Sequence, residues 1–211
     1  MDVKAVERAI GYVFKDKQLL IDALTQKTYG TQHGCKDNER LEYFGDAILQ
    51  FIITERQYLA SQEDEGVLTK RRQGVVCEEA LLEAVEKLGL EKWLRFEGSE
   101  QNIGKKTVSS LYESVLAAIY LDGGMAAAKA FVQAHPPAES DNHNHKGELQ
   151  EYLQGLGLPL PVYTTVDAGD TFKSQVSVQK LTGEGAAVSK RGAEQLAAKQ
   201  LLEKLKNRKE K

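Results

Sequence analysis

The sequence predicts an all-α N-terminal domain followed by a small α+β module whose elements run helix, three strands, helix. Up to residue 134, apolar residues recur at helical spacing, and no segment alternates as a strand would. A breaker-rich stretch, AHPPAESDNHNHK at 134–146, follows and holds two of the four prolines. Alternating strand patterns occur only after it. We therefore expect domains at 1–134 and 146–208, joined by a linker at 135–145.

The helices of the first domain are read from N-cap residues and apolar periodicity. Asp16 is placed to cap a helix through Leu24, and Asn38 to cap one that runs through Gln50. Gly123 and Gly124 are expected to end a helix, because glycine adopts the left-handed conformation of helix ends. Further helices are predicted over 53–60, 68–88, 108–122 and 126–134.

The second module is predicted from alternation between two helical segments. A helix is expected over 147–155 and strands over 162–166 and 172–178, rich in Val, Thr and Phe. A third, short strand is predicted between residues 180 and 188, although Gly183 and Gly185 weaken that pattern. The last helix is predicted over 189–206.

Charge is distributed unevenly between the two parts. The 211 residues carry a net charge of −3, which alone argues against nucleic-acid binding. Before residue 144, however, 17 basic residues face 23 acidic ones, whereas 11 basic residues face 8 acidic ones afterwards. We expect a reduced, cytoplasmic protein without membrane attachment. The apolar runs are too short to span a membrane, the start does not resemble a secretory signal, and the two cysteines, Cys35 and Cys77, are far apart.

The segment NERLEYFGDAILQF at 38–51 is the most informative for chemistry. On a helix, Glu39, Glu42 and Asp46 share one stripe, because residues three and four apart lie on the same face. The apolar residues are expected to pack into the core from the opposite side: Leu41, Phe44, Ile48, Phe51 and Ile52. Two interpretations stay open, a solvated acidic face and a site for a hard cation such as Mg²⁺.

Two further residues bear on this helix. Glu113, in VSSLYESVLAAIYLDGG, is an inward carboxylate that could complete the acidic cluster. Tyr43 lies on the carboxylate side, and burial of this aromatic by a second chain would indicate a dimer. No nucleophile pairs with a histidine, because His33, the only one before residue 135, falls in the polar segment TQHGCKDN and is interpreted as a solvated loop residue.

Over essentially its whole length the sequence resembles bacterial ribonuclease III. The matching segments are NERLEYFGDAIL, FKDKQLLIDALT, DEGVLTKRR, ESVLAAIYLDGG and the C-terminal pair GELQEYLQGLGLPLPVY and SKRGAEQLAAKQLLEKL. The resemblance implies an endonuclease domain of the ribonuclease III type, followed by an α-β-β-β-α double-stranded-RNA-binding domain. It also implies a homodimer that cuts both strands of duplex RNA with Mg²⁺, or Mn²⁺ as a substitute, and leaves 5′-phosphate ends.

The same resemblance assigns roles to residues. Asp46 and Glu113 match catalytic residues, and together with Glu42 they match metal ligands. Glu39 and Glu65 match acidic residues around the site, and Tyr43 matches an aromatic that packs into the partner subunit.

Three positions depart from the family pattern. Ser110 stands where the family usually carries Asp, so the site has one anionic ligand fewer, although a serine hydroxyl could reach a metal through water. Gln26 replaces a common histidine. The loop AGDTFK lacks the usual proline and histidine, and its Asp170 adds a negative charge near the RNA phosphates.

In the second module, Ser189 is expected to cap a helix whose first turn presents Lys190 and Arg191. A helix N-terminus already favours anions, so two cations there would bind phosphate. Gln150 and Glu151, on the preceding helix, could face the RNA minor groove, where duplex shape is read with low sequence specificity.

The sequence therefore predicts a Mg²⁺-dependent endonuclease of double-stranded RNA that processes structured RNA such as ribosomal RNA precursors. One alternative is a catalytically weak or inactive relative that binds duplex RNA without cutting it, which Ser110 motivates. Another is an acidic helical interaction domain with an appended binding module, which leaves the carboxylate stripe unexplained.

Overall fold

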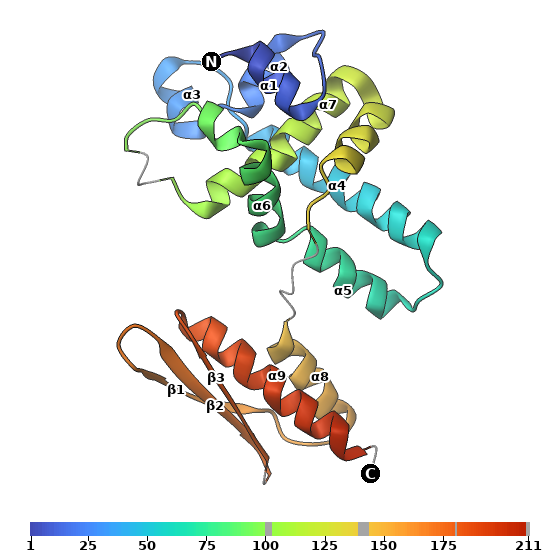
Figure 1. Ribbon diagram of the computed structural model, residues 1–211, viewed down its shortest axis with the longest axis vertical. Coiled ribbons are helices and arrows are strands. Elements are labelled where there is room, and N and C mark those ends of the chain that lie inside the picture. Colours follow the sequence, from blue (N-terminus) through green and yellow to red (C-terminus); the bar gives the residue numbers. More distant parts are fainter. Residues whose placement is uncertain (100–102, 139–143, 180, 210–211) are drawn as a thin grey trace. The chain divides into compact units, whose positions relative to one another are not determined.

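The computed structural model describes residues 1–99, 103–138, 144–179 and 181–209 of the chain. These residues form two compact units, Met1–Asn142 and His143–Lys211, each of which is described by itself. The first unit is helical, and the second is a three-stranded sheet with two helices (Figure 1). The fold class predicted from the sequence is thereby confirmed.

The first unit contains α1 to α7 and one short 3-10 helix, and its bounds are: α1 Val3–Ile10, α2 Lys17–Ala23, α3 Lys27–His33, α4 Glu39–Ala60, α5 Glu65–Val75, α6 Glu78–Leu88, η1 Leu90–Trp93 and α7 Lys105–Ala134. Helix α7 is the central helix, and α2, α4 and α6 pack against it. Its residues Leu111, Val115 and Ile119 are fully buried in the core. By length and composition α7 could also cross a membrane, but here it is the core helix of a helical unit.

Several sequence-based bounds agree with these helices, and others are corrected. Asp16 caps α2 by accepting a hydrogen bond from the Gln18 N–H at 2.9 Å. Asn38 precedes α4 as expected, but its side chain makes no capping bond, and Asp37 instead accepts from the Glu39 N–H at 3.0 Å. The predicted break at the glycine pair is confirmed, because Gly124 has a non-helical φ of 76° inside α7.

Two predicted segmentations are wrong. The helix expected over 53–60 is the continuation of α4, because no breaker interrupts the apolar residues between Phe51 and Ile53. The single helix expected over 68–88 is two helices, α5 and α6, because Cys77 adopts an extended conformation between them. Helices α1 and α3 were not predicted, and His33 lies at the end of α3, stacked on Tyr29, rather than in a loop.

The second unit contains α8 (His145–Gly155), β1 (Val162–Asp167), β2 (Phe172–Val178), β3 (Leu181–Ala187) and α9 (Lys190–Lys209). The strands form an antiparallel sheet in the order β1-β2-β3, with Val176 opposite both Tyr163 and Gly183. Helix α9 packs across all three strands, and α8 packs against α9. A separate core lies between these elements, formed mainly by leucines and alanines of the helices and by Val176 and Val178.

The two glycines that weakened the third strand in the sequence have a structural reason. A Cβ on Gly183 would collide with the carbonyl oxygen of Ala197, and one on Gly185 with the carbonyl oxygen of Ala193. Both carbonyls belong to α9, so β3 can lie against this helix only with glycine at these two positions.

Candidate active site

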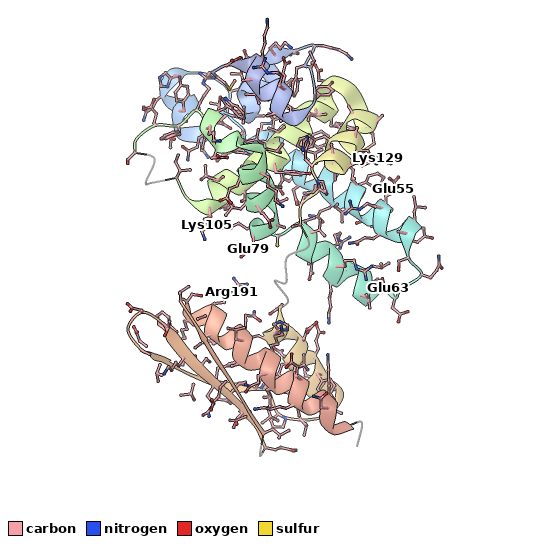
Figure 2. All side chains as sticks on the ribbon, in the orientation of Figure 1. Glu55, Glu63, Glu79, Lys105, Lys129 and Arg191 are labelled. Atoms are coloured by element: carbon pink, nitrogen blue, oxygen red, sulfur yellow. The ribbon has the colours of Figure 1, made fainter. Side chains whose placement is uncertain are left out.

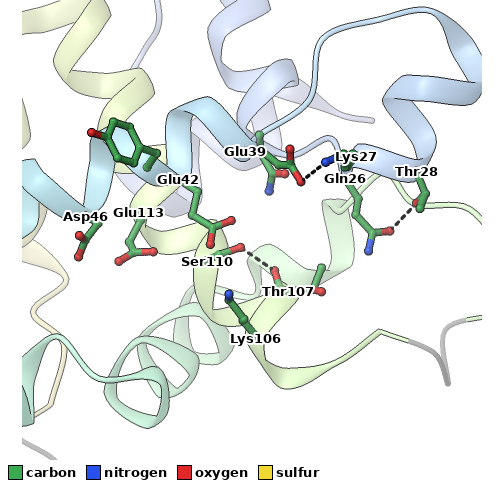
Figure 3. Close-up of a pocket in the computed structure, with 12 residues that line it drawn as sticks. Gln26, Lys27, Thr28, Glu39, Glu42, Asp46, Lys106, Thr107, Ser110 and Glu113 are labelled. Atoms are coloured by element: carbon green, nitrogen blue, oxygen red, sulfur yellow. Dashed lines mark hydrogen bonds and ion pairs between the residues drawn. The ribbon is translucent and has the colours of Figure 1, made fainter.

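The first unit contains an open pocket of about 700 Å³ where α4 begins beside the first turns of α7 (Figure 3). It is lined by Gln26, Lys27, Thr28, Asn38, Glu39, Glu42, Tyr43, Asp46, Lys106, Thr107, Ser110 and Glu113. Four carboxylates from two helices therefore share one solvent-accessible hollow. The stripe predicted on α4 and the glutamate predicted on the second helix are brought together.

Close packing of α4 on α7 positions these carboxylates. Gly45 is buried between Glu42 and Asp46, and a Cβ there would collide with the backbone carbonyl of Glu113. Only glycine lets the two backbones approach so closely. The same contact brings Glu42 and Asp46 on α4 next to Glu113 on α7.

Glu113 is the carboxylate of the pocket whose pKa its surroundings change most. Burial, and then the negative charges of Asp46 and Glu42, raise its pKa to about 8, and Lys106 opposes this rise in part. Without a cation in the pocket, a proton on Glu113 relieves the repulsion. Asp46 is held in place by Gln50, whose Nε2 donates to both carboxylate oxygens at 2.9 and 3.0 Å.

The remaining polar side chains at this site are mostly satisfied within the chain. Lys27 pairs with Glu39 at 2.8 Å. The Ser110 hydroxyl donates to the Thr107 carbonyl at 3.2 Å, and Ser110 is only 5% exposed. Gln26 accepts a hydrogen bond from the Thr28 hydroxyl at 3.0 Å.

The donor set suits a hard divalent cation. Carboxylate oxygens with a nearby hydroxyl are the ligands that Mg²⁺ and Mn²⁺ prefer, and a cation would offset the burial and the negative charges that together raise the pKa of Glu113. Among the described residues, no three Asp, Glu, His or Cys side chains already stand in ligand geometry around a common point. Binding would therefore draw side chains such as that of Asp46 away from their present partners.

Two of the residues expected around the site lie elsewhere or face solvent. Glu65 is exposed on α5 and lines a different pocket, with Thr54, Gln57 and Arg72. Tyr43 lies at the carboxylate pocket but is 83% exposed within a single chain.

The expected apolar face of α4 is partly wrong. Phe44 and Phe51 are 36% and 52% exposed, whereas Ile48 and Ile52 are buried. Phe44 lies edge-on to Tyr120 of α7, and Lys129 of α7 lies over the ring of Phe51, so both phenylalanines lie at the margin of the core rather than inside it.

The second unit presents the predicted basic helix start. Ser189 caps α9 by accepting a hydrogen bond from the Gly192 N–H at 3.1 Å, and Lys190 and Arg191 are exposed in the first turn (Figure 2). Gln150 and Glu151 are exposed on α8. Asp170 lies in the loop between β1 and β2.

Two residues that line the pocket, Lys27 and Lys106, and Gln50, which contacts Asp46 from outside that lining, were not predicted from the sequence. Lys27 and Gln50 act on Glu39 and Asp46, and Gln50 could have been found four residues after Asp46, on the same helix face. Lys106 is the third, four residues before Ser110 and seven before Glu113 on α7. Spacing alone would have placed Lys106 beside these two residues.

Comparison with known proteins covers both units. Residues 16–136 match the family described as Ribonuclease-III-like, and residues 145–205 match the double-stranded RNA binding motif. The chain is 38% identical to the protein named Ribonuclease 3 of Symbiobacterium thermophilum, over 92% of this chain and 90% of that one. It is 36% identical to Ribonuclease 3 of Chlamydia trachomatis, over 96% and 95% of the two chains.

A solved structure resembles the first unit. The nuclease domain of ribonuclease III from Campylobacter jejuni superposes with a TM-score of 0.57 at 31% identity, covering 65% of this chain and all of that one. The published description of that structure refers to a region involved in dimer formation.

Proposed function

The chain belongs to the ribonuclease III family and is an endoribonuclease of double-stranded RNA, and from this premise we propose that it cuts at the carboxylate pocket between α4 and α7. One observation carries the proposal. Glu42, Asp46 and Glu113 converge from two helices on one pocket, where burial of Glu113 and then the negative charges of Asp46 and Glu42 raise its pKa. Such a cluster is locally unfavourable unless a cation sits against it.

In this proposal the three carboxylates hold a divalent cation, Mg²⁺ with Mn²⁺ as a substitute, and Ser110 contributes through a water molecule. When bound, the ion would lower the pKa of a water molecule and neutralise charge on the phosphate. Asp46 and Glu113 touch the reacting groups, and Glu39 adds negative charge at the rim of the pocket. Hydrolysis breaks the bond between phosphorus and the 3′ oxygen, which leaves a 5′-phosphate and a 3′-hydroxyl end.

We further propose that the protein acts as a homodimer. Tyr43 offers a large exposed aromatic at the edge of the pocket, beside exposed Phe44 and Leu121. An apolar patch of this kind on a soluble enzyme marks an interaction surface. Glu65, which lies outside the pocket of its own chain, would then be available to the site of a second copy.

The second unit matches the double-stranded RNA binding motif. It would hold the duplex through Lys190 and Arg191, and Gln150 and Glu151 would face the minor groove. Recognition of shape rather than sequence suits structured RNA, such as ribosomal RNA precursors in the cytoplasm. The alternative of an inactive RNA binder gains no support from the relatives, which are named as ribonucleases.

The test is cleavage of long duplex RNA by the full-length protein in Mg²⁺, beside Glu113→Gln and the control Glu79→Gln, an exposed glutamate on α6 outside the pocket. We expect the parent and Glu79→Gln to cut, and Glu113→Gln to bind duplex RNA without cutting it. End labelling should detect 5′-phosphates. Cleavage by Glu113→Gln at the parental rate would contradict the assignment of the site.

A further inference from the structure

Lys106 is a cation in a pocket otherwise dominated by carboxylates. It lies in the first turn of α7, exposed, and it lines the pocket with Ser110 and Glu113. Figure 3 shows its amino group directed toward Ser110 and the carboxylate of Glu42.

The ammonium group of Lys106 differs from that of the other lysine of the pocket in having no partner among the described residues. Lys27 is held by Glu39 at 2.8 Å. Within the described parts of the chain, the ammonium group of Lys106 forms neither an ion pair nor a hydrogen bond with any residue. Its three N–H donors are therefore available to a ligand.

The position of Lys106 on the helix favours an anionic ligand. A cation near a helix N-terminus is opposed by the helix dipole. The first turn of α7 contains no acidic residue, and its N-cap, Gly104, has no side chain to satisfy the free N–H groups. An anion bound there would complement both the ammonium group and the start of the helix.

Ser110 makes room for such a ligand. It lies one helical turn from Lys106, and its hydroxyl is turned onto the Thr107 carbonyl. A carboxylate at this position would lie next to the ammonium group and pair with it. With serine there, the side of the pocket around Lys106 stays positive while the side around Asp46 stays negative.

We propose that Lys106 binds a backbone phosphate of the RNA strand in the carboxylate pocket, through an ion pair with a non-bridging phosphate oxygen. The inference rests on the proposed function and assigns a substrate contact to a residue that the carboxylate cluster alone does not include. Lysine suits this role, because its ammonium group is a point charge on a flexible stem that adapts to a phosphate.

The test uses the full-length protein with Glu113→Gln as background, so that the RNA stays intact. Dissociation constants for a short duplex RNA are measured by fluorescence anisotropy between about 50 and 200 mM salt. Adding Lys106→Gln should weaken binding and reduce the slope of log affinity against log salt by about 1, the effect of one lost phosphate contact. Lys106→Arg should keep the slope.

The control is Lys105→Gln, which removes the same charge from the neighbouring exposed residue outside the pocket (Figure 2). It should leave the slope unchanged.

With Glu113 intact, Lys106→Gln should lower the single-turnover cleavage rate by roughly 100-fold, the scale for removing one donor to a reacting oxyanion. Lys106→Arg should restore most of that rate.

Each outcome bears on the inference. An unchanged salt slope in Lys106→Gln, with tighter Mg²⁺ binding by titration calorimetry, would mean that Lys106 only neutralises carboxylates, and the inference would be overturned. Equal slope changes in both glutamine variants would also overturn it. A parent protein that neither binds nor cuts duplex RNA would contradict the proposed function itself.

Discussion

At the scale of single residues, Ser110 stands in the carboxylate pocket where a further anionic ligand for the proposed cation could stand. Its hydroxyl is neutral and 5% exposed, next to a glutamate whose pKa is already raised to about 8. Ser110→Asp would add an anionic oxygen ligand. Whenever the pocket holds no cation, it would also add a desolvated negative charge beside Glu113, which pairing with the exposed Lys106 offsets only in part.

We expect Ser110→Asp to cut duplex RNA at lower Mg²⁺ concentrations than the parent, as measured by initial rates across a Mg²⁺ titration. In chelator the variant should unfold at a lower temperature than the parent, and Mg²⁺ should restore it, because a ligand that binds only the folded state stabilises that state. Ser110→Ala is the control, without the added charge. A higher Mg²⁺ requirement in Ser110→Asp would contradict the argument.

The sequence predicted some of these residues and not others, for reasons of distance along the chain. Glu42 and Asp46 lie on one helix, so their common stripe follows from the spacing. Glu113 is 67 residues after Asp46, so the sequence pattern could only suggest that it completes the cluster, and the resemblance to ribonuclease III gave it a role as a ligand. Spacing places Lys106 on the same face of α7 as Ser110 and Glu113, but its position in a pocket shared with α4 depends on how the two helices pack.

At the scale of elements, Gly45 sets the distance between α4 and α7. In Gly45→Ala the added methyl group would meet the Glu113 carbonyl, and the helices would have to separate. We expect a loss of about 1–3 kcal/mol in the free energy of unfolding by denaturant titration, the usual cost of overpacking. Cleavage should fall with it, since Glu113 moves with its backbone.

Gly66→Ala provides the matched control for Gly45→Ala. Gly66 lies in α5 and has open space around its Cα, so the same substitution should raise stability by up to about 1 kcal/mol through helix propensity. If both alanine variants changed stability by the same amount, close packing at Gly45 would not be the cause.

Asp122 forms a second contact between elements, in α7 just before the break at Gly124, and we call it the Asp122 clamp. Its carboxylate accepts hydrogen bonds from the Lys15 and Asp16 N–H groups at 2.9 Å and from the Tyr12 hydroxyl at 2.8 Å. Burial opposes ionisation, but these hydrogen bonds outweigh it and hold the pKa of Asp122 below its usual value of 3.8. The clamp ties the loop after α1 to α7.

Because the pKa of Asp122 is lower in the folded protein, its stabilising effect is present above pH 3.8 and is lost as the pH falls through the folded-state value. We expect Asp122→Asn to lower the free energy of unfolding at pH 7 by about 1–3 kcal/mol. The difference from the parent should shrink below pH 3.8, as followed by circular dichroism. Asp64→Asn, at a cap without a side-chain bond, is the control. A difference that persists in acid would rule out the charge as its source.

The elements themselves were predictable to different degrees. The strands of the second unit and the glycine break in α7 follow from local patterns. The division between α5 and α6 does not follow from a local pattern. Cys77, which is extended between the two helices, is not a residue type that breaks helices. The third strand looked weak because the packing that requires Gly183 and Gly185 involves α9, which comes later in the chain.

At the scale of the whole molecule, the charge is divided according to function. The segment before residue 144 is acidic and contains the carboxylate pocket, whereas the segment after it is basic and contains the RNA-binding module. A net charge of −3 therefore conceals an acidic part, which contains the carboxylate pocket, and a basic part, which matches the double-stranded RNA binding motif. If the basic excess serves duplex binding, affinity should depend on salt mainly through the second unit.

We expect the double variant Lys190→Gln, Arg191→Gln to reduce the slope of log affinity against log salt by about 2, one unit for each phosphate contact. Both residues are exposed in the first turn of α9, so the unfolding temperature should not change. Lys173→Gln with Lys199→Gln removes the same charge from exposed positions outside that turn, and it should leave most of the slope intact. Equal slopes for the two double variants would show that net charge, rather than the start of α9, attracts the duplex. A smaller slope for the first variant would place the phosphate contacts at the turn where the helix dipole and the two cations act together.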